Sequence, residues 1–414
     1  MNRETSAMSE HDGALAGLKV LDFSWAVAGP MTTRVLAVHG ATVVKVESNL
    51  RLDGTRVGPP FKGKPSRNAS GYYADINPNK LSVTLNMGHE DAFAIAKRFV
   101  QWADVVCENF RPGVMHRWGL DYEQLKAVKP EIIMMSSSMQ GAVGPNATHP
   151  GLGGTLGALV GVNNFVGWPD AEPIGMSHPY TDVVGPWFAV TAILGALEHR
   201  DRTGLGQFID LSQFEATMHM MAPALLDYAA NGRVQQRMGN RSPHYAPHGA
   251  YRCQGDSLQG DWVAIAVTND KQWQSFKQAL GKPAWADDPR FETALGRIRA
   301  ADELDTLIEQ WTTDYTPLRV EGLLQERGVP AAVVATAREL HADPQLAHLG
   351  ILPRFDHPRL GDHALTHPAF RLSKTPSEMR RGDLIGEHSE YAYKTFIGMS
   401  DAEYNAGVQS GLIQ

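Results

Sequence analysis

The chain has 414 residues, of which 43% are hydrophobic and 20% are charged, a balance typical of a globular protein rather than a disordered or fibrous one. Its length exceeds the roughly 250 to 300 residues at which one hydrophobic core usually stops growing, so we expect two domains. The formal net charge of −7 provides no general attraction for nucleic acid or an anionic membrane. We therefore expect a soluble protein with neither as a partner.

Signals for disulfides, membrane insertion and secretion are weak. Cys107 and Cys253 are far apart and form no CxxC pair, so the sequence predicts neither a disulfide framework nor a thiolate metal site. The most apolar stretch, residues 183–197, contains a Gly-Pro interruption and is shorter than the ~20 residues that span a bilayer. Residues 1–14 are polar and lack the apolar core of a signal peptide, which predicts a disordered tail and a cytoplasmic protein.

Strands and helices alternate through the first third of the chain. The sequence predicts strands at residues 18–23, 41–47, 81–85, 104–108 and 131–136, and helices at 30–38, 90–102 and 122–128. Such alternation favours an α/β fold with a parallel sheet and right-handed crossovers. Ligands of these sheets collect at the carboxyl ends of the strands.

The second half of the chain predicts a smaller inserted domain. A long apolar helix is expected at residues 183–200, followed by a glycine turn and a helical, Met-rich segment at 213–231. After a loop at 239–249, the sequence predicts strands at 249–253, 262–268 and 331–334 and helices at 272–280 and 300–311. The segment from residue 339 onward is rich in Pro, Gly and His, and we expect it to contain few strong elements.

Several common catalytic templates are absent from the sequence. The junction at residues 24–30 lacks the GxGxxG pattern of a dinucleotide site, and neither a GxxxxGK[ST] phosphate loop nor a GxSxG nucleophile elbow occurs. His244 and His248 are four residues apart, but neighbouring prolines deny them a helix, so a zinc site is not expected. No resident cofactor or metal is predicted.

Ordered blocks along the whole chain resemble the class III CoA-transferase family, which includes formyl-CoA and carnitine CoA-transferases. The blocks are residues 18–23, 28–30, 40–47, 77–80, 103–106, 108–114, 117–120, 144–145, 202–207 and 386–388. The resemblance implies a large Rossmann-like domain formed by residues 15–212 and 335–414, with a linker helix and small domain at 213–334. It also implies two subunits threaded through each other as an interlocked dimer, with a homodimer expected and a heteromer of related subunits left open.

The resemblance also implies which residues contact coenzyme A, which is a substrate rather than a bound cofactor. It places along the CoA molecule Val27, Ala28, Ser48, Lys80, Asn109, Phe110 and Arg117, with Ser138 and Gly141 near the thioester end. Cations and amide groups of these kinds suit phosphates, and Arg111 is a further candidate. Taken singly, Lys80 and Arg117 would be better explained as surface cations and Phe110 as a core aromatic. Inside the matched blocks, CoA binding is the favoured interpretation.

Asp182 fills the place of the catalytic aspartate that the resemblance implies, just before the long helix leading to the RxxTGxGQ segment at residues 200–207. A carboxylate can attack a thioester carbonyl, form a mixed anhydride and release CoA thiolate. Asp182 would also suit a helix N-cap, where an Asp accepts hydrogen bonds from free N–H groups. Such a position would lower its pKa and keep it ionised.

The choice of acid and the exact reaction stay open. The loop at 239–249 occupies the place of a glycine-rich loop in some family members, and Arg241, His244 or Tyr245 is expected to help select the acid. Together with His178, these residues suggest a dicarboxylate such as succinate, carried by succinyl-CoA. An acyl-CoA racemase of the same family is an alternative, but Leu152 and Gly153 stand where its acid/base histidine and the following aspartate are expected. His149 lies three residues earlier and could supply the base only if the alignment is shifted. A non-catalytic CoA-binding subunit is a second alternative.

Overall fold

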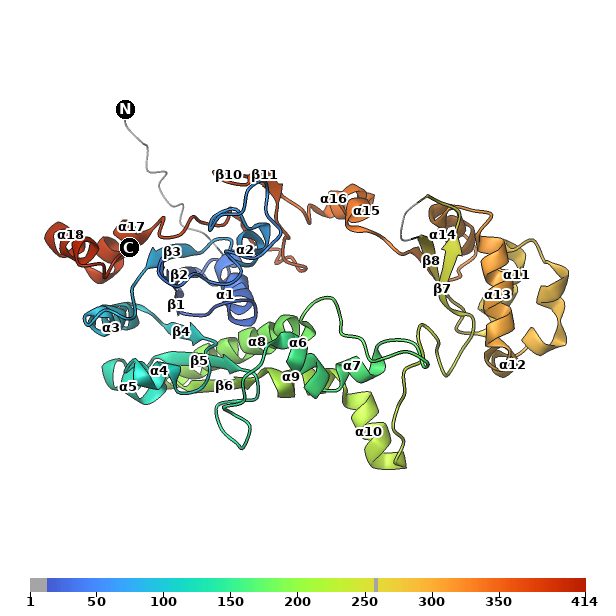
Figure 1. The fold of residues 1–414 in the computed structure, drawn as a ribbon, viewed down its shortest axis with the longest axis horizontal. Coiled ribbons are helices and arrows are strands. Elements are labelled where there is room, and N and C mark those ends of the chain that lie inside the picture. The colour runs from blue at the N-terminus through green and yellow to red at the C-terminus, as the bar shows by residue number, and fades with distance from the viewer. Residues whose placement is uncertain (1–12, 257–259) are drawn as a thin grey trace. The chain divides into compact units, whose positions relative to one another are not determined.

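The computed structural model describes residues 13–256 and 260–414, which form two compact units (Figure 1). The first unit contains the chain up to Asn163, Gly175–Val234 and His348–Gln414, and the second contains Asn164–Ile174 and Gln235–Ala347. The boundaries differ from those expected: residues 213–234 belong to the first unit, and residues 335–347 belong to the second.

The first unit is built on a six-stranded parallel sheet. Its strands are β1 (Lys19–Asp22), β2 (Thr42–Glu47), β3 (Leu81–Thr84), β4 (Val105–Glu108), β5 (Ile133–Ser138) and β6 (Phe208–Ser212). Their order is β3-β2-β1-β4-β5-β6, with Val20 of β1 paired to Val43 on one side and Val105 on the other. The predicted parallel α/β fold is confirmed, and the order reverses between β1 and β4, where such sheets bind ligands.

Helices cover both faces of this sheet, so the central strands are mostly apolar, with buried polar residues such as Asp22 and Lys45 towards their carboxyl ends. On one face α3 (Ala92–Trp102) and α17 (Ser389–Ile397) share a buried cluster with β1, β2 and β3. On the other face α1 (Ala28–Val38) and a long helix, α8, pack against β1, β4 and β5. Strands buried on both faces read as continuous hydrophobic runs. This explains why five of the six strands were predictable.

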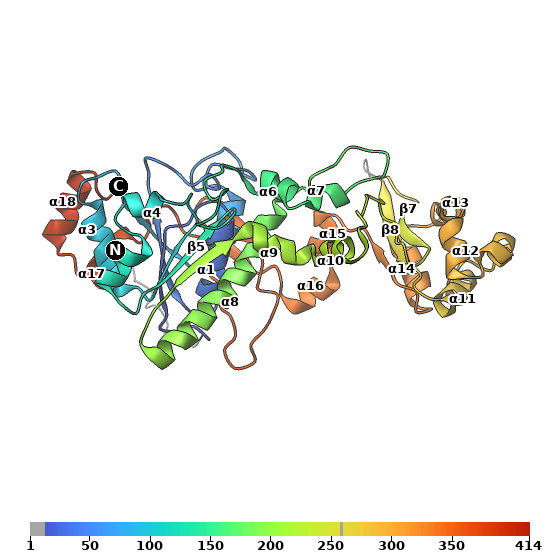
Figure 2. The ribbon, with the colours of Figure 1, turned by 90° about the horizontal axis from the view of Figure 1, so that it is seen from below.

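Helix α8 (Tyr180–Thr203) is longer than the sequence predicted. Its 24 residues continue through Pro186 and end at Gly204, which takes the left-handed conformation (φ 75°) that glycine accepts without a steric penalty. By length and composition α8 could cross a membrane. However, Ala189, Ile193 and Ala196 are fully buried, and α8 lies alongside α1 (Figure 2). It is therefore a core helix of the first unit.

The remaining elements of the first unit are mostly short. They are α2 (Gly71–Ile76), α4 (Val114–Arg117), α5 (Tyr122–Val128), α6 (Gly153–Leu159), α9 (Gln213–Met220), α10 (Ala222–Asn231), β10 (Arg354–His357), β11 (Gly361–Ala364) and α18 (Asp401–Gln409). Two short helices, α7 (Val162–Phe165) and α16 (Pro344–Leu349), cross the boundaries between the two units. The expectation of few C-terminal elements was wrong. Tyr393 of α17 is fully buried and its hydroxyl donates to the Thr84 carbonyl (2.9 Å), so the chain's end completes the core beside β3.

The second unit is a small α/β domain. Its antiparallel sheet has the order β7 (His248–Cys253), β8 (Asp261–Ala266), β9 (Ala331–Val333). The α-helices that belong with it are α11 (Asp270–Ala279), α12 (Ala294–Arg299), α13 (Ala301–Thr312), α14 (Pro317–Gln325) and α15 (Ala337–Ala342). Its core includes Trp273 and Phe276, and the buried Arg297 guanidinium donates to the Ala246 carbonyl (2.8 Å). The 239–249 loop is thereby fixed to this core at its end.

Candidate active site

A cavity of about 530 Å³ opens at the carboxyl ends of the strands, where the strand order reverses between β1 and β4. Its lining consists of Phe23, Trp25, Val46, Glu47, Ser48, Leu50, Arg51, Leu85, Asn86, Met87, Gly88, Phe110, Arg111, Val114, Arg117 and Trp118. Three predicted CoA contacts, Ser48, Phe110 and Arg117, therefore line one cavity. The position agrees with the general rule for ligands of doubly wound sheets.

The walls of this cavity suit a nucleotide with phosphate groups. The ring centroids of Trp25 and Phe110 lie 6.1 Å apart, and those of Phe110 and Trp118 lie 5.2 Å apart. The Arg51 guanidinium lies 5.3 Å from the centroid of the Trp25 ring. Aromatic faces stack on bases and guanidinium groups pair with phosphates. Trp25 and Arg51 were missed as site residues, because neither belongs to a spaced motif.

Lys80 does not lie in this cavity, contrary to its predicted contact with CoA. Its side chain is 2% exposed, and Nζ donates to Asp22 Oδ2 (3.1 Å), the Pro30 carbonyl (2.9 Å) and Asn77 Oδ1 (2.8 Å). These contacts use all three N–H donors of the ammonium group. Burial lowers the pKa of Lys80 to about 8, although the charge of Asp22 opposes this shift. Lys80 is therefore a buried cation that pairs within the protein and lies outside this cavity.

Asn109 also acts within the protein. Its Oδ1 accepts from the Trp25 N–H (2.7 Å) and its Nδ2 donates to the Trp25 carbonyl (2.8 Å), so both ends of the amide are occupied. Asn109 thus fixes the backbone that carries a cavity wall. Val27 and Ala28 are buried at the start of α1, immediately after this loop.

Asp182 is the third residue of α8 and lies in its first turn, while Pro179 occupies the N-cap position. Its side chain accepts no hydrogen bond from residues 13–256 or 260–414. Burial raises the pKa of Asp182 from 3.8 to about 6. The predicted lowering of its pKa was wrong, because desolvation of the carboxylate outweighs the favourable helix end. A carboxylate left without partners in this way is suited to act as a nucleophile.

Gly153 allows the backbone to approach this carboxylate. A Cβ atom at this position would lie 2.7 Å from Asp182 Oδ2 and 2.5 Å from Pro179 Cβ. The preceding Leu152 is 79% exposed. The segment that would carry a racemase's base therefore presents only a glycine to Asp182. Tyr72 was missed by the sequence analysis; burial raises its pKa, and the charge of Asp182 contributes to the same shift.

Ser138 and Gly141 lie at and after the carboxyl end of β5. The Ser138 hydroxyl is buried and has no hydrogen-bond partner among the described residues. Gly141 has a positive φ of 89°, and the next N–H, from Ala142, donates to both Asp210 oxygens (2.9 and 3.0 Å). The turn is therefore fixed to β6, and Ser138 offers an unused donor at the strand end.

Glu108, at the end of β4, is a further buried carboxyl group beside the cavity wall. Burial raises its pKa to about 7, against the opposing hydrogen bonds from Ser136 and the Phe110 N–H, the latter 2.6 Å long. Glu108 thus holds the start of the segment that carries Phe110 into the cavity. It lies inside a recognised sequence block, but only its burial marks it as unusual.

The residues expected to select the acid lie in the second unit. Arg241 pairs with Asp302 and with Asp305 (3.0 Å), so two carboxylates neutralise its charge. His244 is exposed, and the Tyr245 ring packs edge-on against His248 (centroids 5.3 Å apart). His178, in the first unit, is also exposed. Arg241 therefore does not offer an unpaired cation to an acid.

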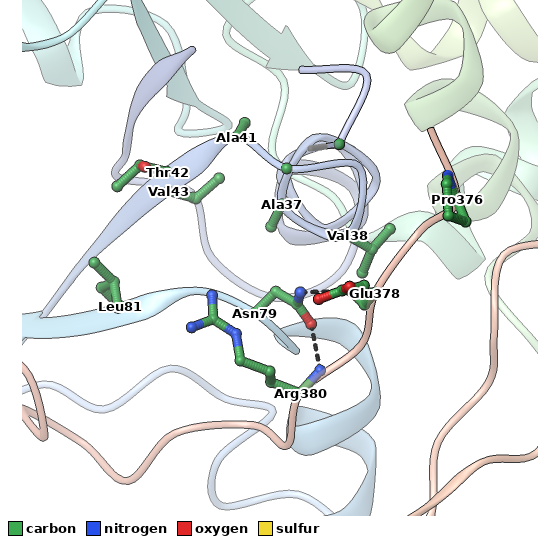
Figure 3. A pocket seen from close by; sticks show the side chains of 12 residues that line it. Ala37, Val38, Ala41, Thr42, Val43, Asn79, Leu81, Pro376, Glu378 and Arg380 are labelled. Atoms are coloured by element: carbon green, nitrogen blue, oxygen red, sulfur yellow. Dashed lines mark hydrogen bonds between the residues drawn. The ribbon is translucent and has the colours of Figure 1, made fainter. Parts of the chain in front are cut away.

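The turn at residues 77–80 anchors the C-terminal segment. Asn79 has a positive φ of 64°; its Nδ2 donates to the Glu378 carbonyl (2.8 Å) and its Oδ1 accepts from the Arg380 N–H (2.7 Å) (Figure 3). The cavity drawn there has a volume of about 70 Å³, too small for a nucleotide. The possible ligand atoms of Asp383, Glu387 and His388 lie within 4.8 Å of one another, close enough to hold a metal ion. However, the Glu387 carboxylate already pairs with Arg381 (2.9 Å).

Comparisons with known proteins identify the family of this chain. A model of CoA-transferase family III matches residues 15–389. The succinyl-CoA–D-citramalate CoA-transferase of Chloroflexus aurantiacus is 32% identical over 94% of this chain and 95% of its own length. The succinyl-CoA–L-malate CoA-transferase beta subunit of the same organism is 29% identical over 94% of this chain and 96% of its own length.

A solved structure of a CAIB/BAIF family protein from Brucella suis has the same fold. It superposes with a TM-score of 0.85 at 32% identity, and the match covers 93% of this chain and 99% of that one. The family match spans both units and every residue of the site described above. The chain therefore belongs to CoA-transferase family III, and it is a class III CoA-transferase.

Proposed function

We propose that this enzyme transfers CoA from an acyl-CoA to a free carboxylic acid through covalent intermediates on Asp182. The observation that carries the proposal is the partly buried carboxylate of Asp182, which has no hydrogen-bond partner among the described residues. A carboxylate in this state keeps its nucleophilic oxygen free for a substrate. The alternative of a non-catalytic CoA-binding subunit would leave such a group without a purpose.

The proposed chemistry needs no redox partner. A carboxylate oxygen of Asp182 attacks the thioester carbonyl, the C–S bond breaks, and CoA leaves as thiolate from the mixed anhydride. The thiolate attacks the Asp182 carbonyl carbon, which releases the donor acid and forms an aspartyl-CoA thioester. The acceptor carboxylate attacks the carbonyl carbon of that thioester, the C–S bond breaks, and a second mixed anhydride forms as CoA thiolate leaves. The thiolate then attacks the acceptor's carbonyl carbon in this anhydride, which gives the product acyl-CoA and regenerates the Asp182 carboxylate.

The donor is proposed to be succinyl-CoA. This part of the proposal is supported by the names of the two Chloroflexus relatives, both of which are succinyl-CoA enzymes. Arg241, which the sequence suggested as a cation for a dicarboxylate, does not support it, because its charge is already paired. An acyl-CoA racemase is disfavoured because Gly153, which lies against Asp182, has no side chain that could act as the second acid/base. Exchange of solvent deuterium into the α-position of a chiral acyl-CoA, without an acceptor acid, would instead indicate the racemase.

We further propose that the enzyme is a cytoplasmic, interlocked homodimer. In the single chain none of the residues of α10 is buried, and its Leu225, Leu226 and Tyr228 are 46%, 67% and 61% exposed. Contiguous exposed apolar side chains are typical of protein–protein contact surfaces. A heteromer is the second possibility, since some relatives are alpha and beta subunits of one enzyme. Light scattering on the purified chain distinguishes a dimer from a monomer that needs another subunit.

The proposal is tested with Asp182→Asn and Asp182→Glu. Transfer of CoA from succinyl-CoA to a panel of free acids is followed by mass spectrometry. The Asn variant should lose transfer by at least about a thousandfold, while the Glu variant keeps a carboxylate displaced by about one bond and should retain a trace of activity. Undiminished transfer by Asp182→Asn would refute the nucleophilic role.

A further inference from the structure

The loop between β1 and α1 has an unusual backbone. Ala26 lies in the left-handed region, with φ 57°, a conformation that is unfavourable for any residue with a Cβ atom. Its own side chain is exposed, so burial of the methyl group does not account for this conformation. The neighbouring Trp25 forms a wall of the large cavity. Other groups must therefore hold this loop in place.

Side chains from separate elements hold each residue of the loop. The Ser24 carbonyl accepts from Lys45 Nζ of β2 (2.7 Å), and the Ser24 N–H donates to Asp22 (2.9 Å). The Ala26 N–H donates to both oxygens of Asp53 (3.2 Å each). Together with the amide of Asn109 on Trp25, these contacts fix three consecutive residues.

The holding groups are charged and almost completely removed from solvent. Asp22, Lys45, Asp53 and Lys80 are at most 3% exposed, and we call these four residues the buried charge cluster. Lys80 pairs with Asp22 (3.1 Å) and Lys45 with Asp53 (3.7 Å), so two positive and two negative charges balance. Charges with so little access to water are stable only as a set, because removal of one leaves its partner unpaired.

We propose that Asp53 and Lys45 are positioning residues for CoA binding, because they hold the Ser24–Ala26 backbone that places Trp25 in the cavity wall. They act through the loop and touch no substrate. The inference rests on the proposed function to the extent that CoA occupies this cavity. The buried charge cluster thus has a role in holding the cavity wall, and Lys80 contributes to it by neutralising the charge of Asp22.

The test compares CoA binding by the full-length enzyme and its variants, measured by calorimetry, with steady-state transfer kinetics. In Asp53→Asn the charged acceptor of the Ala26 N–H is lost. The dissociation constant of CoA and the KM for succinyl-CoA should rise about tenfold, the effect of losing a hydrogen bond to a charged group. The kcat should change much less, because Asp182 is untouched.

Rescue distinguishes positioning from general destabilisation. Glycine takes the left-handed conformation without a penalty, so Ala26→Gly in the Asp53→Asn background should restore most of the CoA affinity. If Asp53→Asn does not fold, Ala26→Val tests the same loop, because a β-branched residue opposes positive φ and this side chain is exposed. Ala26→Val should then weaken CoA binding without a large loss of thermal stability.

The control is Asp104→Asn, which removes a carboxylate at the opposite end of β1 that pairs with Arg200 (3.0 Å) and accepts from the Lys19 N–H (2.9 Å). It should reduce stability and leave CoA affinity unchanged. Unchanged CoA affinity in Asp53→Asn, or in Ala26→Val, would overturn the inference, as would an absence of rescue by Ala26→Gly. A wild-type enzyme that binds CoA but forms no Asp182 intermediate would instead refute the proposed function alone.

Discussion

Replacing Asp182 with Asn should make the protein more stable at neutral pH while it abolishes transfer. Burial raises the pKa of this carboxyl from 3.8 to about 6, so the folded state binds its proton more tightly than the unfolded state. Protonation of Asp182 therefore contributes to the free energy of unfolding; this contribution is fully present below pH 4 and is lost as the pH rises through about 6. The full difference is about 3 kcal/mol, an upper limit because solvent screens part of the charge.

The amide introduced by Asp182→Asn does not titrate, so the variant lacks this pH dependence. From pH 5 to pH 8, the unfolding free energy of the wild-type protein should fall by about 1 kcal/mol relative to the variant, which is the part of the shift titrated in that interval. Urea unfolding of both proteins at the two pH values measures this directly. A variant that loses stability at pH 8 relative to the wild type would refute the conclusion that Asp182 is an unpaired, desolvated carboxylate.

Asp22 supplies a control of opposite sign. Burial alone would raise its pKa, but the charges of Lys80 and Lys45 and the hydroxyls of Ser24 and Thr33 lower it to about 2. Its stabilising effect is therefore present above pH 4 and lost as the pH falls towards 2. Asp22→Asn should destabilise the protein at pH 8, whereas Asp182→Asn stabilises it there.

Three further outcomes are expected. The kcat/KM for succinyl-CoA should fall about tenfold per pH unit below pH 6, because only ionised Asp182 attacks; a profile flat down to pH 5 would contradict this. Arg117→Ala should raise the KM for succinyl-CoA about tenfold, because a charge-assisted contact with CoA is lost. The control is Arg98→Ala: the Arg98 guanidinium lies 3.6 Å from Glu403 and outside the cavity, so its loss should not change the KM. Equal effects of the two substitutions would argue against CoA in this cavity. Gly153→Ala should lower kcat about a hundredfold by displacing Asp182, whereas Gly154→Ala, with nothing within 4 Å of the added Cβ, should retain activity; an active Gly153→Ala enzyme would contradict the close approach.

Much of the first unit could be predicted, because its central strands are buried on both faces and carry short apolar runs. The edge strand β6 (Phe208–Ser212) was missed, since its FIDLS sequence follows a glycine turn and only its last residue, Ser212, is buried. The single helix predicted over 213–231 is two helices, which meet at Met221 just before Pro223. Element types followed from local pattern, whereas these boundaries depended on neighbours in space.

The site was predicted less completely, and the reasons are specific. A motif places Lys80 near the crevice, but only the fold shows that its ammonium points beneath the loop to Asp22. The helix-end argument for Asp182 considered one local effect, while the pKa is decided by desolvation from the surrounding fold. Trp25 became part of the cavity through Asn109, which lies 84 residues away in sequence. Such contacts have no signature in a single sequence.

The most direct test of the account is to trap the covalent intermediate on Asp182. The wild-type enzyme is incubated with succinyl-CoA, treated with hydroxylamine or borohydride, digested and analysed by mass spectrometry. The account predicts a hydroxamate or a reduced side chain at Asp182, formed only in the presence of the acyl-CoA. Modification at another residue, or no modification during turnover, would contradict it.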